Sequence, residues 1–186
     1  MKKYVYTLAL TGIVMVNGTY TYYIYERNKK IKQYDPLTTV LDVDLKKFSG
    51  NWYEISKLSP RYEDKACNSQ VHYTLQPNGM IEVKNTVNLG SVDGPQKTIT
   101  GFAKPTDSTN AKWNLTYYWP FSTQYWITDL DENYEWAVVG EPTRENLWIL
   151  SRKPKIDRNI YTGLVEKARA KQFAVEKLHE TPQKDA

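Results

Sequence analysis

The side chains that could carry out covalent chemistry are few in this sequence. Cys67 is the single cysteine and therefore the only possible thiol nucleophile. A thiol becomes a reactive thiolate when a base or a positive charge lies beside it. The nearest histidine in the sequence is His72, which strand alternation places on the opposite face from Val71 and Tyr73. Because no base can be assigned to Cys67, we predict no catalytic residue.

The sequence also lacks the pattern of a metal or cofactor site. His72 and His179 are the only histidines and stand far apart, and no spacing of cysteine, histidine and carboxylates matches a metal site. We therefore predict no metal and no cofactor. Glu54 has the parity of Trp52 and would point inward from a strand. Because a buried carboxylate needs a partner, we expect a hydrogen-bonded structural glutamate rather than a general acid.

One aromatic residue and one cation stand where the two ends of a barrel would meet. Gly50-Asn51-Trp52 opens a strand-like run, and the run over residues 147–152 ends in Arg152. If these runs are neighbours, the guanidinium can lie flat on the indole, a contact worth about 0.5–2 kcal/mol. Thr128-Asp129 lies between them and is expected to hydrogen-bond backbone groups around the closed end. We assign structural roles to Gly50, Trp52, Thr128, Asp129 and Arg152.

Strand-like runs recur at close spacing along the middle of the chain, with turn residues between them. Pro77-Asn78-Gly79 is the strongest of these turn signals. Pairing of neighbouring runs predicts an all-β antiparallel sheet. The eight runs cover approximately residues 52–59, 69–76, 80–88, 97–104, 111–119, 124–130, 134–140 and 147–152.

The period changes after the last of these runs. Asp157 is suited to cap a helix, and Ile160, Leu164 and Ala168 then recur at four-residue spacing. We predict one amphipathic α-helix that packs its apolar stripe on the outer wall of the sheet. The apolar residues between 173 and 178 suggest a short extra edge strand, and residues 179–186 are expected to form a disordered tail.

These motifs, in this order, resemble the lipocalin family, most closely its bacterial outer-membrane-type and apolipoprotein D-like members. The resemblance rests on residues 50–55 (GNWYEI), 73–75 (YTL), 119–121 (WPF) and 147–154 (LWILSRKP). It implies an eight-stranded antiparallel up-and-down barrel that holds one small apolar ligand. It also implies a helical turn around Phe48 that plugs the closed end, and a C-terminal α-helix packed on the wall.

Alternation along each strand gives two faces, and the family pattern indicates which face points into the barrel. Packing alone allows either a filled barrel or a cavity, but the resemblance favours a cavity. Asn85 and the hydroxyls of Tyr73, Tyr117 and Tyr125 would be its polar groups. The predicted ligand-binding residues are Val71, Tyr73, Ile81, Val83, Asn85, Gly101, Trp113, Leu115, Tyr117, Tyr125, Ile127, Ala137, Val139 and Trp148.

Four loops are expected at the open mouth: residues 59–68, 89–96, 118–121 and 141–146. Arg61, Lys65 and Arg144 could meet a carboxylate or phosphate there, although we favour their interpretation as solvated rim charges. Trp119 and Phe121 are stronger indications of a functional role at the mouth, because loop aromatics gate ligand entry or touch a membrane interface.

The N-terminal segment has the composition of a membrane anchor. Lys2 and Lys3 precede an uncharged stretch from Tyr4 to Tyr25, which is long enough to span a bilayer and ends in clustered tyrosines. We predict an uncleaved anchor, with a cleaved signal peptide as the alternative. No cysteine lies in this segment, so the lipid-anchored mode common among bacterial lipocalins is not expected.

We therefore predict an anchor or signal over residues 1–32, a linker over 33–41, a barrel with its helix over 42–178 and a tail over 179–186. The net charge of +4, from 25 basic and 21 acidic residues, is too balanced to indicate nucleic-acid binding. The resemblance implies binding, storage or transport of a fatty acid or lysophospholipid at the cell envelope, facing the periplasm. The alternatives are a lipid-modifying enzyme that uses Cys67, a structural envelope protein with a filled barrel, and a periplasmic or secreted carrier.

Overall fold

The computed structural model describes residues 20–59 and 66–184, and the chain divides into two compact units. The first unit is Met1–Asp35, whose described part contains a helix over residues 20–31, and the second is Pro36–Ala186. Among the described residues, no helix combines the length and the apolarity that a membrane crossing needs. Residues 4–19 of the predicted anchor lie outside the described residues, so the anchor remains a prediction.

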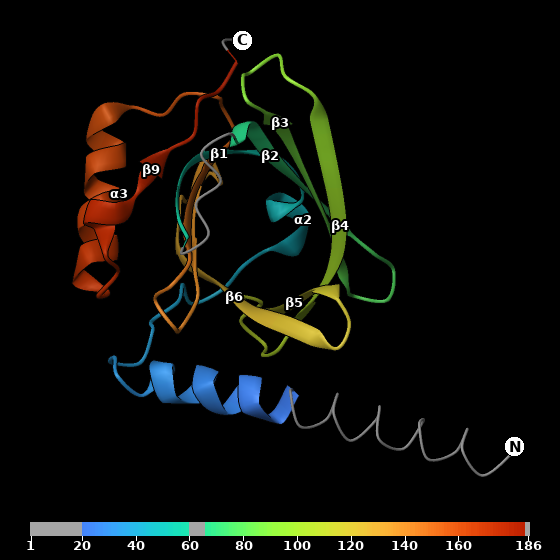
Figure 1. The fold of residues 1–186 in the computed structure, drawn as a ribbon, viewed down its shortest axis with the longest axis vertical. Coiled ribbons are helices and arrows are strands. Elements are labelled where there is room, and N and C mark those ends of the chain that lie inside the picture. Colours follow the sequence, from blue (N-terminus) through green and yellow to red (C-terminus); the bar gives the residue numbers. More distant parts are fainter. Residues whose placement is uncertain (1–19, 60–65, 185–186) are drawn as a thin grey trace, which may run out of the picture. The chain divides into compact units, whose positions relative to one another are not determined.

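An antiparallel sheet makes up most of the second unit (Figure 1). Its consecutive strands pair in sequence order, as the turn signals predicted, and a short ninth strand is added at β1. The strands are β1 (Gly50–Leu58), β2 (Ala66–Leu75), β3 (Ile81–Leu89), β4 (Gln96–Pro105), β5 (Lys112–Tyr118), β6 (Phe121–Leu130), β7 (Trp136–Gly140), β8 (Leu147–Ser151) and β9 (His179–Glu180).

The first strand closes the sheet into a barrel. One edge of β1 pairs with β2, where Trp52 lies opposite Val71. Its other edge pairs with β8, where Tyr53 lies opposite Ser151. Because β1 has a neighbour on each side, strands β1 to β8 form a closed antiparallel up-and-down barrel, and the predicted fold class is confirmed.

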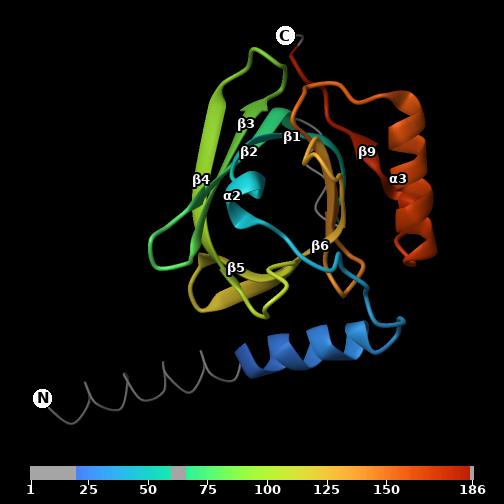
Figure 2. The same ribbon diagram turned by 180° about the vertical axis from the view of Figure 1, so that it is seen from behind.

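A single helical turn, α2 (Leu45–Phe48), plugs one end of the barrel and lies within the ring of strands (Figure 2). Asp44 caps this turn by accepting hydrogen bonds from two backbone amides. The ring of Phe48 packs 4.9 Å from that of Trp52 and 5.4 Å from that of Trp113, measured between centroids. The Trp52 indole nitrogen donates to the Phe48 carbonyl at 2.8 Å. This aromatic cluster closes the end that the resemblance predicted.

The Thr128-Asp129 pair has its expected role only in part, because Thr128 bonds a backbone group but Asp129 does not. The Thr128 hydroxyl donates to the Val138 carbonyl at 3.3 Å, which lies in the neighbouring strand. The Asp129 carboxylate forms an ion pair with Lys171 and lies 3.9 Å from the ammonium of Lys167. Both lysines lie at the end of the C-terminal helix, so Asp129 ties that helix to the barrel and does not bind the plug.

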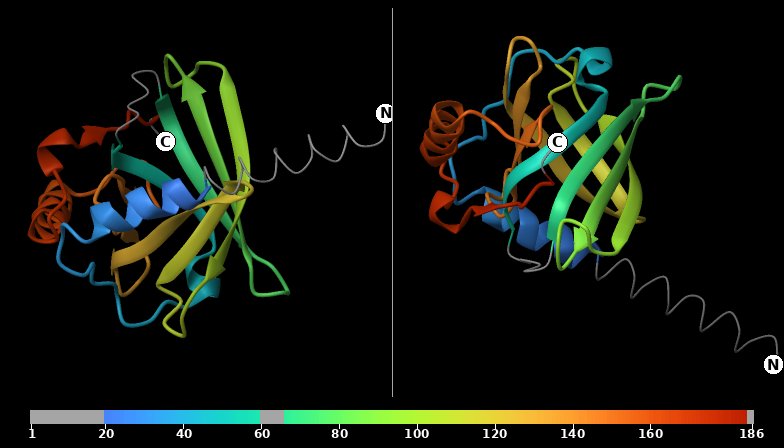
Figure 3. Two further views of the ribbon diagram at one scale, coloured as in Figure 1. Left: turned by 60° about the horizontal axis from the view of Figure 1, so that its bottom comes forward. Right: turned by 90° about the horizontal axis from the view of Figure 1, so that it is seen from above.

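The predicted outer helix is α3 (Arg158–Ala170), which Asp157 caps and which lies outside the barrel wall (Figure 3). Tyr161, Leu164 and Ala168 are its buried residues. Ile160 was expected in this stripe, but it is 41% exposed. A helix turns by 100° per residue. Tyr161 therefore lies on the same side of the helix as Leu164 and Ala168, whereas Ile160 is turned away from that side.

The end of the chain was expected to be a tail, but residues 179–184 pack on the barrel. We call this segment the C-terminal strap. β9 pairs with β1, placing Glu180 opposite Ser56, and the Thr181 amide donates to the Ile55 carbonyl at 2.9 Å. The Pro182 carbonyl then accepts from the Asn68 amide of β2 at 2.6 Å. The strap therefore bridges β1 and β2, and the extra edge strand lies after residues 173–178 rather than within them.

Candidate functional site

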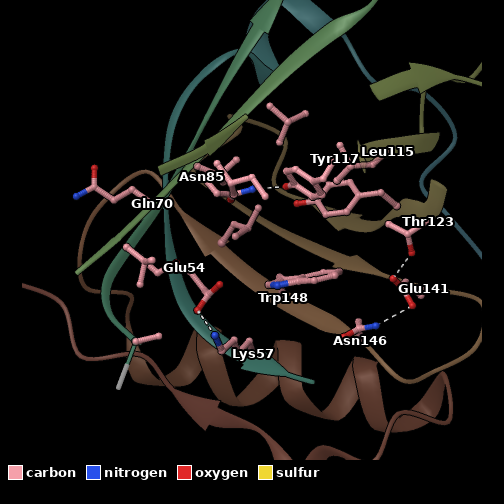
Figure 4. A pocket seen from close by; sticks show the side chains of 18 residues that line it. Glu54, Lys57, Gln70, Asn85, Leu115, Tyr117, Thr123, Glu141, Asn146 and Trp148 are labelled. Atoms are coloured by element: carbon pink, nitrogen blue, oxygen red, sulfur yellow. Dashed lines mark hydrogen bonds and ion pairs between the residues drawn. The ribbon is translucent and has the colours of Figure 1, made fainter. Parts of the chain in front are cut away.

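A cavity of about 350 Å³ lies inside the barrel, walled by strands from around the sheet (Figure 4). Its volume is at the lower end of the range that small-molecule sites occupy. The lining residues are Glu54, Lys57, Ala66, Ser69, Gln70, Val71, Val83, Asn85, Val87, Ile99, Leu115, Tyr117, Thr123, Tyr125, Glu141, Asn146, Trp148 and Leu150.

Half of the predicted ligand-binding residues line this cavity. They are Val71, Val83, Asn85, Leu115, Tyr117, Tyr125 and Trp148. Six others point inward but pack in the core around the plug instead: Tyr73, Ile81, Trp113, Ile127, Ala137 and Val139. Gly101 makes room for a lining residue, because a Cβ at that position would lie 2.7 Å from the ring of Tyr117.

The expected polar groups are paired with one another. The hydroxyls of Tyr73 and Tyr125 share a hydrogen bond of 2.5 Å, and the Asn85 amide donates to the Tyr117 hydroxyl. Burial raises the pKa of Tyr117 to about 12, and it also raises the pKa of Tyr73 and of Tyr125 well above the ordinary range. These phenols therefore remain neutral at physiological pH and provide hydrogen-bonding sites without charge.

Glu54 brings a carboxylate into the cavity wall. Glu54 is 8% exposed, and its Oε1 accepts a hydrogen bond from the Thr181 hydroxyl at 2.8 Å. The Lys57 ammonium lies 3.9 Å from the same oxygen. The expected hydrogen-bonded glutamate is present, but its place in the cavity wall was not predicted. Its shared parity with Trp52 indicated the inward direction, but not its height in the barrel.

Glu141 is a second buried carboxylate, whose burial the sequence did not predict. The Thr123 hydroxyl donates to Oε1 at 2.5 Å, while the Thr143 hydroxyl and the Asn146 amide donate to Oε2 at 3.1 and 2.8 Å. Burial nevertheless raises the pKa of the Glu141 carboxyl. Three of these four residues belong to the loop between β7 and β8, so this carboxylate holds the loop against the start of β6. No local pattern marks Glu141, because Thr123 is distant in the sequence.

Arg144 is neither a ligand contact nor a solvated rim charge. Its side chain is buried, and Nε donates to the Lys171 carbonyl at 2.7 Å while Nη1 donates to the Pro142 carbonyl at 2.8 Å. The guanidinium also lies over the ring of Phe173 at 5.4 Å. It therefore joins the loop between β7 and β8 to the end of α3. Arg61 and Lys65 lie outside the described residues.

The candidate groups for chemistry are not brought together. Cys67 is half-buried in β2 opposite Asn88 and is not among the residues that line the cavity. His72 lies on the exposed side of β2, where its Nδ1 is 2.5 Å from Oδ1 of Asn51. Within residues 20–59 and 66–184, no three cysteine, histidine or acidic side chains form a group that could hold a metal. The cavity lining thus combines apolar side chains with hydrogen-bonding groups.

Known proteins with similar sequences point to the same fold. The family model described as a lipocalin-like domain matches residues 43–183. Temperature-induced lipocalin-1 of Arabidopsis thaliana is 33% identical over 159 residues, which cover 80% of this chain and 84% of that protein. The outer membrane lipoprotein Blc of Vibrio cholerae is 30% identical over 141 residues, which cover 75% of this chain and 82% of that protein.

Solved structures show the same barrel. Insecticyanin from the tobacco hornworm Manduca sexta has a TM-score of 0.64 at 18% identity, over 81% of this chain and 86% of that chain. At this identity the likeness concerns the fold alone. The family match, however, spans the plug, the barrel, α3 and most of the C-terminal strap, and relatives at 30% identity or more align over three quarters of the chain. This chain therefore belongs to the lipocalin family.

Proposed function

We propose that this protein binds one small lipophilic ligand, a fatty acid or a lysophospholipid, inside the barrel and stores or carries it without chemical turnover. The observation that carries this proposal is the 350 Å³ cavity, whose lining is largely apolar. Each methylene that an alkyl chain buries there contributes about 0.8 kcal/mol. The hydrogen-bonded, neutral tyrosines supply polar contacts without repelling the chain.

Two alternatives are supported less well. A filled structural barrel would leave no space for a ligand, whereas this barrel encloses a cavity between the plug and the mouth. A lipid-modifying enzyme would need an activated nucleophile facing its substrate. Cys67 is the sole thiol of the chain and is not part of the cavity wall.

We further propose that the ligand is handled at the cell envelope, by a membrane-associated protein whose barrel faces the periplasm. Two observations support this placement: the relative from Vibrio cholerae bears the name outer membrane lipoprotein, and residues 1–32 have the composition of an anchor or signal. If the segment is a cleaved signal, the protein is instead a periplasmic or secreted carrier.

Native mass spectrometry of the full chain, purified from cells and then incubated with fatty acids and lysophospholipids, tests ligand binding. The cavity-filling variant Ile99→Trp should lose the bound lipid, because Ile99 lines the cavity. Thr100→Trp is the matched control, since this neighbouring residue of β4 is exposed. Failure of the wild-type protein to retain any lipid would contradict the proposal, as would equal retention by the two variants.

A further inference from the structure

The charged groups of the cavity are unequally distributed. Among the described residues that line it, Glu54 and Glu141 are the two acids and Lys57 is the one base. Glu54 and Lys57 both belong to β1 (Figure 4). The walls formed by β3, β4 and β5 contribute mainly apolar side chains, namely Val83, Val87, Ile99 and Leu115. An amphiphilic ligand thus meets polar groups along β1 and apolar groups along β3 to β5.

The two carboxylates differ in how fully they are paired. Glu141 uses both oxygens, since Oε1 accepts one hydrogen bond and Oε2 accepts two. Glu54 uses Oε1 for both Thr181 and Lys57. No described residue donates a hydrogen bond to Glu54 Oε2, and Figure 4 shows this second oxygen turned toward the middle of the cavity. Glu54 therefore presents a free acceptor to whatever occupies the space.

A free carboxylate oxygen in this position distinguishes between ligand heads. The Glu54 residue is 8% exposed, so water screens its charge poorly. A ligand carboxylate placed beside it would bring two negative charges together, with Lys57 as the single described base to offset them. An ammonium or hydroxyl group would instead donate a charge-assisted hydrogen bond to Oε2. The bond would satisfy the acceptor that the protein leaves open.

We propose that Glu54 is the residue that selects the ligand head, favouring single-chain lipids whose head donates hydrogen bonds through an ammonium or hydroxyl group over lipids with a bare carboxylate. This inference rests on the proposed function and narrows it. The alkyl chain lies against Val83, Val87, Ile99 and Leu115, while the head lies against the β1 wall. Free fatty acids are then the weaker ligands of this barrel.

Isothermal titration of the full chain at pH 7 tests the proposal with three ligands that share a twelve-carbon chain: laurate, laurylamine and 1-monolaurin. The amine and the glyceride can donate a charge-assisted hydrogen bond that laurate cannot, so we expect both to bind at least about tenfold more tightly than laurate. Glu54→Gln keeps an oxygen for Thr181 but removes the charge. It should reduce the preference for laurylamine over laurate by about tenfold.

Glu82→Gln is the matched control, because Glu82 lies in β3 between the inward residues Ile81 and Val83 and is not a lining residue. The control should leave the preference unchanged. Two results would overturn the inference: laurate binding to the wild-type protein as tightly as laurylamine, or equal preferences in the two variants. If Glu54→Gln does not fold, the affinities of the wild-type protein for the three ligands still test the inference. Failure of all three ligands to bind would instead contradict the proposed function.

Discussion

The guanidinium of Arg152 lies over the indole of Trp52, with its central carbon 3.9 Å from the ring centroid. The same guanidinium donates hydrogen bonds to the carbonyls of Lys47, Ser49 and Asn51, at 2.6, 3.0 and 2.8 Å. Arg152 therefore joins the end of β8 to both the plug and the start of β1. The predicted pairing of the two residues is confirmed, and the backbone contacts make Arg152 a clamp on the closed end.

Truncation of Trp52 should destabilise the barrel far more than it alters ligand choice. Its side chain is fully buried beneath Phe48 and Arg152 and is not a lining residue of the cavity. Trp52→Ala should lower the free energy of unfolding by about 3–5 kcal/mol. Urea unfolding measures this change, and laurylamine titration below the transition measures binding. An unchanged stability with an altered ligand preference would contradict this prediction.

Arg152→Ala should cost less than Trp52→Ala. The variant loses a cation–π contact and hydrogen bonds to backbone carbonyls, but the guanidinium is only partly buried and water can reach the carbonyls. We expect a loss of about 1–3 kcal/mol in urea unfolding. Arg169→Ala on the exposed face of α3 is the control and should change stability by less than about 0.5 kcal/mol. A loss of unfolding free energy larger than that of Trp52→Ala would contradict this prediction. It would mean that the contacts of Arg152 stabilise the barrel more than the buried indole does.

Removing the hydroxyl of Thr181 should loosen the C-terminal strap. Thr181→Val is nearly isosteric. It deletes the hydroxyl that donates to Glu54 Oε1 and keeps the hydrogen bond from the Thr181 backbone amide to the Ile55 carbonyl. The buried Oε1 loses its hydrogen-bond donor and, among the described residues, keeps only the Lys57 ammonium at 3.9 Å, so the free energy of unfolding should fall by about 1–3 kcal/mol. Hydrogen exchange of the Asn68 and Thr181 amides, compared with amides of α3, reports whether the strap opens locally. Unchanged exchange at these two amides would argue that the strap is held without Thr181.

Stability should depend on pH through Glu141. Burial raises the pKa of this carboxyl in the folded state above its ordinary value of 4.5, so its ionised form costs stability above the raised pKa. The cost disappears as the pH falls through that value. Relative to Glu141→Gln, the wild-type protein should therefore gain stability between pH 7 and about 4.5. Urea unfolding at several pH values measures the difference. Glu82→Gln is the control and should show no such trend relative to wild type.

The N-terminal segment should hold the full-length protein in a membrane. The stretch from Tyr4 to Tyr25 is uncharged and long enough to span a bilayer. We expect the protein to fractionate with membranes and to resist carbonate extraction, and a chain lacking residues 1–32 to be released. Mass spectrometry of the mature N-terminus is the direct measurement. A start near residue 19 would identify a cleaved signal and a free carrier.

Local patterns in the sequence were enough to predict an antiparallel sheet, and the family resemblance implied that this sheet closes into a barrel. Alternation depends on strand geometry alone and gave two faces for each strand. The family pattern then indicated that Val71, Val83 and Trp148 lie on the inward face. The turn at Pro77-Asn78-Gly79 and the cap at Asp157 are equally local. The pairing of Trp52 with Arg152 needed the family resemblance as well, because it joins the first and eighth strands.

Alternation together with the family pattern indicates whether a side chain points inward, but not how deep in the barrel it lies. Phe48 of the plug packs on Trp52, Tyr73 and Trp113, and this packing fills the closed half. Tyr73 and Trp113 consequently became core residues, whereas Tyr117 and Tyr125 line the cavity. The height of the plug decides this division, and it is a property of the assembled barrel.

The polar groups of the cavity depend on contacts between distant parts of the chain. Glu54 is held by Thr181, 127 residues away, and Arg144 is buried by contacts with Lys171 and Phe173. The sequence by itself determined the strands, their two alternating faces and the outer helix, because strand and helix periodicity are local. The tertiary structure alone decided which inward residues enclose space and which carboxylates face it, because burial of a charged group requires partners that only folding brings together.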